Sequence, residues 1–422
     1  MKRKIETLIV IIALALFLTV VLTQAFLLVI TDKKQINTEE DYRFLSTSGT
    51  KIVNMQGEEV VLRGLNAGGL FVLEEWMCPV TDSTELGELD QKKILAKLET
   101  RFGYDKSRQL MRAYEDSWWG EEDFDNIKNA GFNSIRLPFT YMNLEDAEGN
   151  ITKFEKLDWF IDLCDEKDLY VILDLHGAYG SQNGKHHSGD TSGTDLFDNV
   201  TNKEKTINLW VTVANRYKDR SIVAGYDLLN EPEGAEGQTG WKQWLFYFEL
   251  CNAIRQIGDE HILIIESVWE TDNLPSPAWF TGQGCIVYSF HEYNWPLYPL
   301  PEEEKLDFQM QFVDKKMQNL ENANFGIPIY IGEYNFFNHI PSWEYALTEY
   351  RKENISWAVW TYKVKEPGSY WGLYTPTANL EQVDIATDSY DEMLQKIAQF
   401  KTSNTFTIHP ELSAMFREFF SK

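Results

Sequence analysis

The sequence predicts an α/β fold of the (β/α)8 barrel type, and three observations carry this prediction. Apolar runs with strand character recur along the chain and alternate with stretches of helical periodicity. The runs are almost continuously apolar, which is typical of parallel strands buried on both faces. Eight such units follow residue 50, the number that closes a parallel barrel. A doubly wound open sheet is the alternative, although no strand is followed by a G-x-G-x-x-G loop.

Each of the eight units begins with an expected strand, which a helical stretch follows. In chain order the strands span residues 60–66, 132–137, 169–176, 222–230, 261–266, 286–291, 327–332 and 355–360. Helices are expected between them, because apolar residues there recur every three or four positions. The clearest helical stretches are residues 121–130, which end at a capping Gly131, the stripe Leu157, Phe160, Ile161 and Cys164, and residues 203–218, 241–257 and 307–323.

The N-terminus predicts a transmembrane helix within residues 1–30. Leu8–Ile30 is almost wholly apolar and follows the basic run Lys2-Arg3-Lys4. A helix of this length, at about 1.5 Å per residue, spans the roughly 30 Å of a bilayer core. A cleaved signal peptide, whose apolar part is shorter, stays open as the alternative. The basic end is expected in the cytoplasm, so the rest of a single-pass chain would lie outside the cell membrane, or be secreted after cleavage.

Two further segments complete the predicted organisation. Residues 31–50 are polar and aperiodic, and we expect a stem there. Residues 51–422 show no internal repeat or linker, and they are expected to form one catalytic domain that acts as a monomer.

The amino-acid composition limits the kinds of partner that the chain can bind. The 65 acidic residues outnumber the 39 basic ones and give a formal charge of −26. Such a chain repels nucleic acid, so no nucleic-acid partner is expected, whereas a neutral polymer is compatible. Cys78, Cys164, Cys251 and Cys285 lack metal or redox spacing. They are expected to be buried free thiols, and disulfides stay open.

No metal or other cofactor is expected. His186, His187 and Asp190 lie close in sequence. Adjacent histidine side chains splay apart in most conformations, however, and no third ligand follows at useful spacing.

Two strand-like runs stop at a glutamate, one in Asn230-Glu231-Pro232 and the other in Gly332-Glu333-Tyr334. Parallel strands of one barrel would bring both glutamates to its C-terminal face, where such enzymes keep their chemistry. Two carboxylates across a cleft are the minimal equipment for cleaving a glycosidic bond. Other strands also end in residues capable of chemistry, namely Arg136, His176, Glu266, His291, Tyr293 and Trp360.

Five short motifs in order carry a resemblance to a known family. They are Ile135–Pro138 (IRLP), Leu173–Gly177 (LDLHG), Leu229–Pro232 (LNEP), His291–Tyr293 (HEY) and Ile331–Tyr334 (IGEY). Together they resemble glycoside hydrolase family five, which belongs to a clan of retaining glycosidases built on this barrel. Each motif alone is weak, and N-E-P occurs widely.

Two longer segments resemble the exo-β-1,3-glucanases of yeasts and their bacterial relatives. They are Arg63–Glu74, similar to R-G-V-N-L-G-G-W-x-V-L-E, and His176–Gly184, similar to H-G-A-P-G-S-Q-N-G. The chain departs from that pattern at Leu70, where a Trp is usual, at Tyr179, where a Pro is usual, and at Lys185-His186-His187. These departures leave open which linkage is cleaved.

The resemblance implies that Glu231 is the general acid/base and Glu333 the nucleophile. Arg136 and Tyr293 would stabilise the charge of Glu333, while burial and that charge would raise the pKa of Glu231. The resemblance also implies supporting roles for residues around the pair. Asn230 would bond the sugar 2-hydroxyl, and His176 and His291 would bind hydroxyls and orient the two glutamates. Trp360 would stack on the sugar, and Glu74 would bind hydroxyls of the terminal sugar. Glu266 could compete for a cleft role, and Lys363 could reach a sugar or solvent.

The expected function is hydrolysis of β-glucan by a retaining glycosidase, exo-β-1,3-glucanase-like, through a covalent glycosyl-enzyme intermediate. An endo-β-1,4-glucanase or mannanase on the same barrel is the alternative among enzymes. A surface protein that binds carbohydrate without cleaving it is the alternative from another class.

Overall fold

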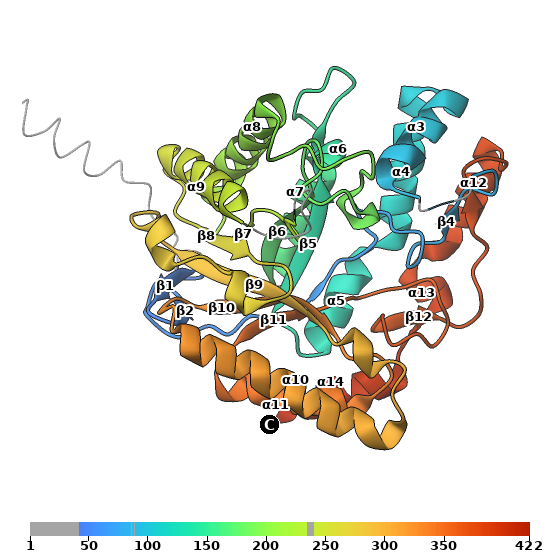
Figure 1. Ribbon diagram of the computed structural model, residues 1–422. Coiled ribbons are helices and arrows are strands. Elements are labelled where there is room, and N and C mark those ends of the chain that lie inside the picture. Colours follow the sequence, from blue (N-terminus) through green and yellow to red (C-terminus); the bar gives the residue numbers. More distant parts are fainter. Residues whose placement is uncertain (1–41, 86, 88, 234–239) are drawn as a thin grey trace, which may run out of the picture. The chain divides into compact units, whose positions relative to one another are not determined.

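Eight parallel strands close into a barrel in the computed structural model (Figure 1). Around the barrel they follow the chain order, and the last strand pairs with the first. Each overlaps one of the eight predicted runs, so the (β/α)8 barrel prediction is confirmed. The strands are β3 (Arg63–Asn66), β5 (Ser134–Thr140), β6 (Tyr170–Gly177), β7 (Val223–Asp227), β8 (Ile262–Glu266), β9 (Ile286–Tyr293), β10 (Ile329–Asn335) and β11 (Ser356–Val359).

The structure describes residues 42–85, 87, 89–233 and 240–422. Residues 44–422 form one unit. The predicted transmembrane helix lies outside the described residues. Among the helices that are described, none has both the length and the apolar character needed to cross a bilayer.

A hairpin of β1 (Ser46–Ser48) and β2 (Lys51–Val53) precedes the barrel. Residues 44–50, which the sequence assigned to the polar stem, therefore belong to the folded unit. The reason is apolar burial: Leu45 and Ile52 pack in one cluster with residues of the barrel strands, namely Ile172, Ala224, Ile262, Ile264, Val287, Tyr330 and Ala358.

Helices connect successive strands. They include α5 (Glu121–Asn129), α7 (Glu155–Glu166), α8 (Val200–Tyr217), α9 (Trp241–Gln256), α10 (Glu302–Ala323) and α11 (Ile340–Lys352). The predicted stripe on α7 is buried. Gly131 follows α5 with φ 99°, a conformation that favours glycine and ends the helix before β5. The other α-helices among the described residues are α3 (Gln91–Phe102), α4 (Tyr104–Trp118), α6 (Tyr141–Leu144), α12 (Tyr390–Ile397), α13 (Thr402–Thr405) and α14 (Pro410–Ser421).

The segment after β11 packs back onto the barrel. Phe416 of α14 stacks on Trp357 of β11, and α10, α11 and α14 lie side by side (Figure 1). Lys363 lies beneath this segment, not at a sugar site or in solvent, which corrects the sequence-based expectation. Its ammonium donates to three acceptors: the carbonyl oxygens of Trp118 and Phe400 and the hydroxyl of Thr402.

Strand alternation divides the barrel interior into two layers. On β8, Ile262 and Ile264 point into the same apolar cluster, and Glu266, two positions further on, is the next residue on that face. The interior is therefore apolar near the N-terminal ends of the strands and polar at their C-terminal ends. The four cysteines are free thiols, as the sequence predicted, with three of them buried.

Candidate active site

A cleft of about 480 Å³ opens at the C-terminal ends of the barrel strands. Its lining mixes carboxylates, histidines and indole rings, a composition typical of a carbohydrate site. It contains Glu74, Trp76, His176, Lys185, His186, His187, Asn230, Glu231, Trp269, Tyr293, Trp295, Glu333, Trp360 and Trp371. Every predicted site residue lines this cleft except Arg136 and His291, which are buried against the two glutamates.

Arg136 on β5 is the centre of the polar layer and is wholly buried. Its Nε donates to Asp227 Oδ2 at 2.9 Å, and its guanidinium lies 3.2 Å from Asp174 Oδ2. It also donates to the side-chain oxygens of Asn66, at 3.0 Å, and Asn230, at 2.9 Å. A planar fork of donors suits this task, since several acceptors surround one side chain.

Burial and mutual repulsion act on the carboxylates around Arg136. Burial raises the pKa of Asp174 to about 7, although the Arg136 charge opposes the shift. Burial likewise raises the pKa of Asp227 to about 6. Glu266 is also buried, and burial together with the charge of Asp227 raises its pKa well above the usual range.

Glu333 on β10 accepts one strong donor on each oxygen. The Arg136 guanidinium donates to Oε1 at 2.8 Å, and the Tyr293 hydroxyl donates to Oε2 at 2.8 Å. Both bonds favour the ionised carboxylate, which is the form a nucleophile requires. Burial and the adjacent Glu333 charge raise the pKa of Tyr293 well above its usual range, so its hydroxyl stays a donor.

Glu231 follows β7 and faces Glu333. One carboxylate oxygen of each lies within 4.8 Å of the other, together with a nitrogen of His291. Retaining glycosidases hold their two carboxyl groups about 5–5.5 Å apart, and inverting ones about 6.5–9.5 Å. The spacing therefore fits direct attack on the sugar rather than a water between sugar and carboxylate.

The backbone holds Glu231 in an uncommon conformation. Its φ is 45°, in the left-handed region that non-glycine residues rarely adopt. Its N–H donates to Glu266 Oε1 at 2.9 Å. Glu266, which the sequence left as a possible cleft residue, therefore anchors the strand end from inside the barrel and does not line the cleft.

The expected rise in the pKa of Glu231 is wrong for this structure. Burial does raise it, but the charge of His187 and hydrogen bonds from two histidines outweigh burial, so its pKa lies well below the usual range. His291 Nδ1 lies 2.9 Å from Oε1, and His187 Nε2 lies 3.0 Å from Oε2. Sequence reasoning assigned no partner to Glu231 from the loop that carries His187.

His176 and Trp360 form one wall of the cleft. Their rings stack with centroids 5.6 Å apart and planes 11° apart. His176 Nδ1 lies 2.6 Å from Asp174 Oδ2, which orients the ring. Burial lowers the pKa of His176 to about 3, so a neutral imidazole faces the cleft.

Arg136, which lies beneath the cleft, orients the side chain of Asn230. Because its Oδ1 accepts from Arg136, its amide nitrogen is the end left for a ligand hydroxyl. The carbonyl oxygen of Asn230 accepts from Gln182 Nε2, which ties this residue to the loop after β6.

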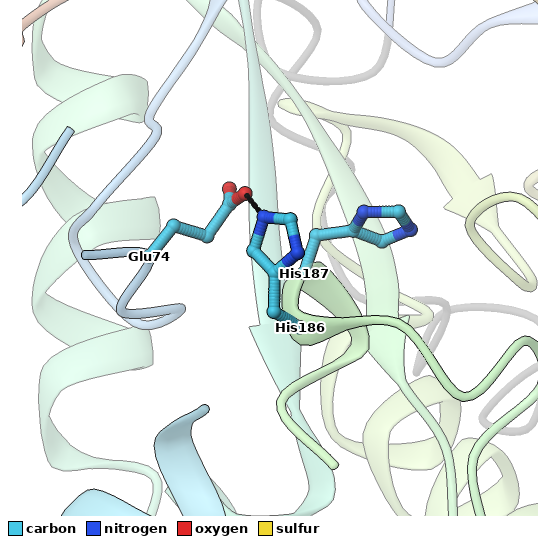
Figure 2. A group of neighbouring side chains, drawn as sticks. All are labelled: Glu74, His186 and His187. Carbon is cyan, nitrogen blue, oxygen red and sulfur yellow. Dashed lines mark ion pairs between the residues drawn. The ribbon is translucent and has the colours of Figure 1, made fainter. Parts of the chain in front are cut away.

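Glu74 and His186 pair at one end of the cleft (Figure 2). Glu74 Oε2 lies 3.0 Å from His186 Nε2 and accepts from Trp76 Nε1 at 2.9 Å. Its Oε1 is buried and has no hydrogen-bond partner among the described residues. Although burial raises the pKa of Glu74, the bond from His186 and the nearby imidazole charges lower it below its usual value. This end of the cleft can accept hydrogen bonds from sugar hydroxyls.

The departures from the expected motifs differ in their consequences. Leu70 is buried in the core, and Tyr179 stacks on Tyr141 and donates to Glu145, so neither lines the cleft. Lys185, His186 and His187 do line it. The changes that matter for a ligand are therefore those in the loop after β6.

Two sets of side chains in the described part of the chain could offer ligand atoms to a cation. They are Glu74 with His186 and His187, and Glu231 with His291 and Glu333. Asp190, which the sequence placed near the histidine pair, instead pairs with Lys92 at 2.7 Å.

Sequence reasoning missed several cleft residues. Trp76, Trp269, Trp295 and Trp371 line it from loops beyond the strand ends. Trp295 packs on Tyr293 and Trp371 with centroids 5.7 Å and 5.6 Å away. Their only signal in the sequence is an excess of tryptophan, which also fits an ordinary core.

Comparison with known proteins relates the sequence of this chain to glycoside hydrolases. Residues 98–366 match the family model described as cellulase (glycosyl hydrolase family 5). The chain is 28% identical over 351 residues to a β-xylosidase of Phanerodontia chrysosporium, covering 76% of this chain and 71% of that protein. It is 31% identical over 242 residues to probable glucan 1,3-beta-glucosidase A of Aspergillus fumigatus, covering 55% of each. The match thus spans about half the length of that glucosidase.

Solved structures share the fold. An endogalactoceramidase superposes with a TM-score of 0.56 at 17% identity, covering 84% of each chain. The endoglucanase Cel5A of Thermotoga maritima superposes with a TM-score of 0.50 at 20% identity, covering 80% of this chain and 96% of that one. The family model covers more than half of the chain, and it includes both glutamates and the polar layer beneath them. The chain belongs to glycosyl hydrolase family 5, a family of glycoside hydrolases.

Proposed function

We propose that the protein is a retaining β-glycosidase that removes terminal glucose from β-1,3-glucan. One observation carries the proposal. Glu333, whose charge Arg136 and Tyr293 stabilise, faces Glu231 at the spacing of a retaining pair within a cleft walled by indole rings. The names of the glucosidase relatives and the similarity of Arg63–Glu74 to exo-acting enzymes support the substrate class.

The reaction has two steps. In the first, Glu333 attacks the anomeric carbon while Glu231 protonates the departing oxygen, and a covalent glycosyl-enzyme forms. Esterification removes the Glu333 charge. Glu231, now a carboxylate, takes a proton from water, which then attacks the anomeric carbon and releases the sugar with retained configuration.

The remaining residues bind the sugar. The Asn230 amide donates to the 2-hydroxyl, a contact that strengthens in the transition state. Trp360, held against His176, supplies a flat apolar face for the ring. Glu74, which lines one end of the cleft, accepts from a hydroxyl of the terminal unit.

The sugar has a second candidate. The relative named β-xylosidase aligns with most of this chain, and this similarity favours a β-xyloside as the substrate. An endo-β-1,4-glucanase or mannanase, which cleaves within the polymer and not at its end, remains the alternative activity. Rates on p-nitrophenyl β-glucoside and β-xyloside, with product analysis on laminarin, cello-oligosaccharides and manno-oligosaccharides, separate these cases. Release of single glucose units from laminarin supports the proposal, and shortened cello- or manno-oligomers overturn it.

The catalytic assignment is tested by Glu333→Gln. Turnover should collapse while sugar binding, measured by calorimetry, survives, because amide and carboxylate have similar size. Glu292→Gln is the matched control, since Glu292 is equally buried and bonds Tyr350 instead of the cleft. Burial raises the pKa of Glu292 to about 7, so a neutral amide there is a mild change. Unchanged turnover in Glu333→Gln would sink the assignment and favour a protein that only binds carbohydrate.

We also propose that Leu8–Ile30 anchors the protein in the cell membrane, with the catalytic domain outside. The apolar length and the preceding Lys2-Arg3-Lys4 support this orientation. The full chain should stay in the membrane fraction after carbonate washing, and protease added outside intact cells should release activity. A mature N-terminus beyond residue 30 would show a cleaved signal instead.

A further inference from the structure

One ion pair at the cleft wall has no part in the two chemical steps. Lys185 Nζ and Trp269 Nε1 both donate to Glu233 Oε1, at 2.7 Å and 3.1 Å. Lys185 and Trp269 line the cleft, whereas Glu233 is buried and does not line it. The ammonium also lies 5.9 Å from the centre of the Trp269 ring. One carboxylate thus fixes a cation and an indole next to each other on the cleft wall.

Both side chains lie on the side of the cleft that holds the acid/base glutamate. Lys185 comes two residues before His187, whose Nε2 lies 3.0 Å from Glu231 Oε2. The Trp269 ring lies 6.3 Å from the ring of His291, whose Nδ1 lies 2.9 Å from Glu231 Oε1. Because Glu231 protonates the departing oxygen, the group that leaves must lie on this side too. Lys185 and Trp269 are therefore placed to contact the leaving group.

The backbone around Trp269 is held in an unusual conformation. Val268 has a φ of 71°, which is a genuine outlier for a β-branched residue. Its carbonyl oxygen accepts the N–H of His291 at 2.5 Å. The next carbonyl oxygen, that of Trp269, accepts from Lys316 Nζ at 2.5 Å. Such conformations persist where the surroundings impose them, and they cluster at ligand sites. The indole therefore has a fixed place on the wall.

The ammonium of Lys185 can donate to a ligand. Its side chain is 38% exposed, and Glu233 takes one of its three N–H donors. Glu74, Glu231 and Glu333 line the same cleft, so a negatively charged ligand is disfavoured. A neutral hydroxyl can accept from the ammonium, whereas an apolar group would only remove water from it. These charges favour a hydroxylated leaving group, such as a second sugar unit.

We propose that Lys185, held by Glu233, selects a sugar as the leaving group by donating to its hydroxyls. The proposal rests on the proposed function and deepens it. A sugar offers hydroxyls to the ammonium and an apolar ring face to Trp269. The same place can receive an acceptor in the second step: the acceptor hydroxyl gives its proton to Glu231, its oxygen bonds to C1, and the bond from C1 to Glu333 breaks. A sugar bound there yields a longer product in place of hydrolysis.

The test measures this transfer with the full chain. The donor is 2,4-dinitrophenyl β-glucoside, whose leaving group departs without a proton from Glu231. The acceptors are methyl β-glucoside and benzyl alcohol, and the transfer product is compared with free glucose for each. In Lys185→Met, transfer to methyl β-glucoside should fall by about tenfold or more, because a hydrogen bond from a charged group is lost. Transfer to benzyl alcohol, which binds through its ring, should not change.

Two further substitutions separate sugar recognition from support of the loop. Lys92→Met is the matched control, because Lys92 pairs with Asp190 at the same 2.7 Å but does not line the cleft. It should leave both transfer ratios unchanged. Glu233→Leu removes the acceptor that holds Lys185, and sugar transfer should fall. Glu233→Gln should keep most of it, since the amide oxygen can still accept from both donors.

Three results would overturn the proposal. They are undiminished sugar transfer in Lys185→Met, an equal fall for both acceptors, and a wild type that transfers to methyl β-glucoside no better than to benzyl alcohol. Failure of the proposed function looks different. The wild type would then release no dinitrophenol from the β-glucoside, or Glu333→Gln would release it as fast as the wild type.

Discussion

Replacing Arg136 by methionine should destabilise the protein more at pH 8 than at pH 5. The side chain is wholly buried, and its guanidinium reaches the carboxylates of Asp174, Asp227 and Glu333 within 3.2 Å. Methionine fills much of the volume but leaves these carboxylates without a cation. Removing one partner of a buried ion pair costs about 3–5 kcal/mol.

Protonation sets the pH dependence. The pKa of Asp174 is about 7 and that of Asp227 about 6 in the folded protein, above their usual value, because burial disfavours their charges. Loss of the Arg136 charge raises both further. At pH 5 both are then neutral, and the cost falls toward the ~1–3 kcal/mol of unsatisfied polar groups. At pH 8 the protein must either bury a charge or bind a proton, and the full cost appears.

Urea denaturation at pH 5 and pH 8, followed by tryptophan fluorescence, measures this difference. Arg136→Lys is the control, because it keeps the charge while losing the fork that reaches Asp227, Glu333 and Asn230 together. It should recover most of the stability at pH 8 but little activity. Equal destabilisation of the methionine variant at both pH values would refute the electrostatic reasoning.

Two further perturbations test the site and the segment behind it. Tyr293→Phe removes the 2.8 Å donor to Glu333 Oε2. A hydrogen bond to a charged group contributes about 1.5–3 kcal/mol, so kcat should fall roughly 10- to 150-fold, and a change under threefold would show that the bond is not used. Lys363→Met tests a buried ammonium whose pKa burial lowers to about 7. The unfolded lysine, with a pKa of about 10.4, binds a proton that the folded one releases, so wild-type stability should rise from pH 7 to pH 10 relative to the variant. Parallel stability curves for wild type and variant would contradict that shift.

The barrel and the two glutamates could be predicted because both depend on the pattern of apolar residues within short segments. Continuous apolar runs mark strands buried on both faces, and a glutamate at the end of such a run must emerge at the C-terminal rim. Arg136, His176, His291 and Tyr293 could be placed for the same reason, since each lies on a strand. Glu74 could be placed from the segment Arg63–Glu74, and Trp360 as the last residue of the eighth predicted strand.

Loop positions could not be predicted in the same way. His187 lies more than forty residues before Glu231, and nothing in its spacing indicates contact. Its position depends on Gln182 and Asn183, which donate to the backbone oxygens of Asn230 and Glu231 at the end of a different strand. Lys363 shows the reverse case, since it follows a strand end as a site residue would, yet a C-terminal segment covers it.

The sequence by itself determined the strands, their common direction and the two glutamates at their ends, because a continuous apolar run is a property of a short segment. Only the tertiary structure decided which groups surround Glu231 and therefore where its pKa lies. A pKa depends on burial and on charges a few ångströms away, whatever their distance along the chain. Here His187 and His291 reverse the shift that burial and Glu333 alone predict.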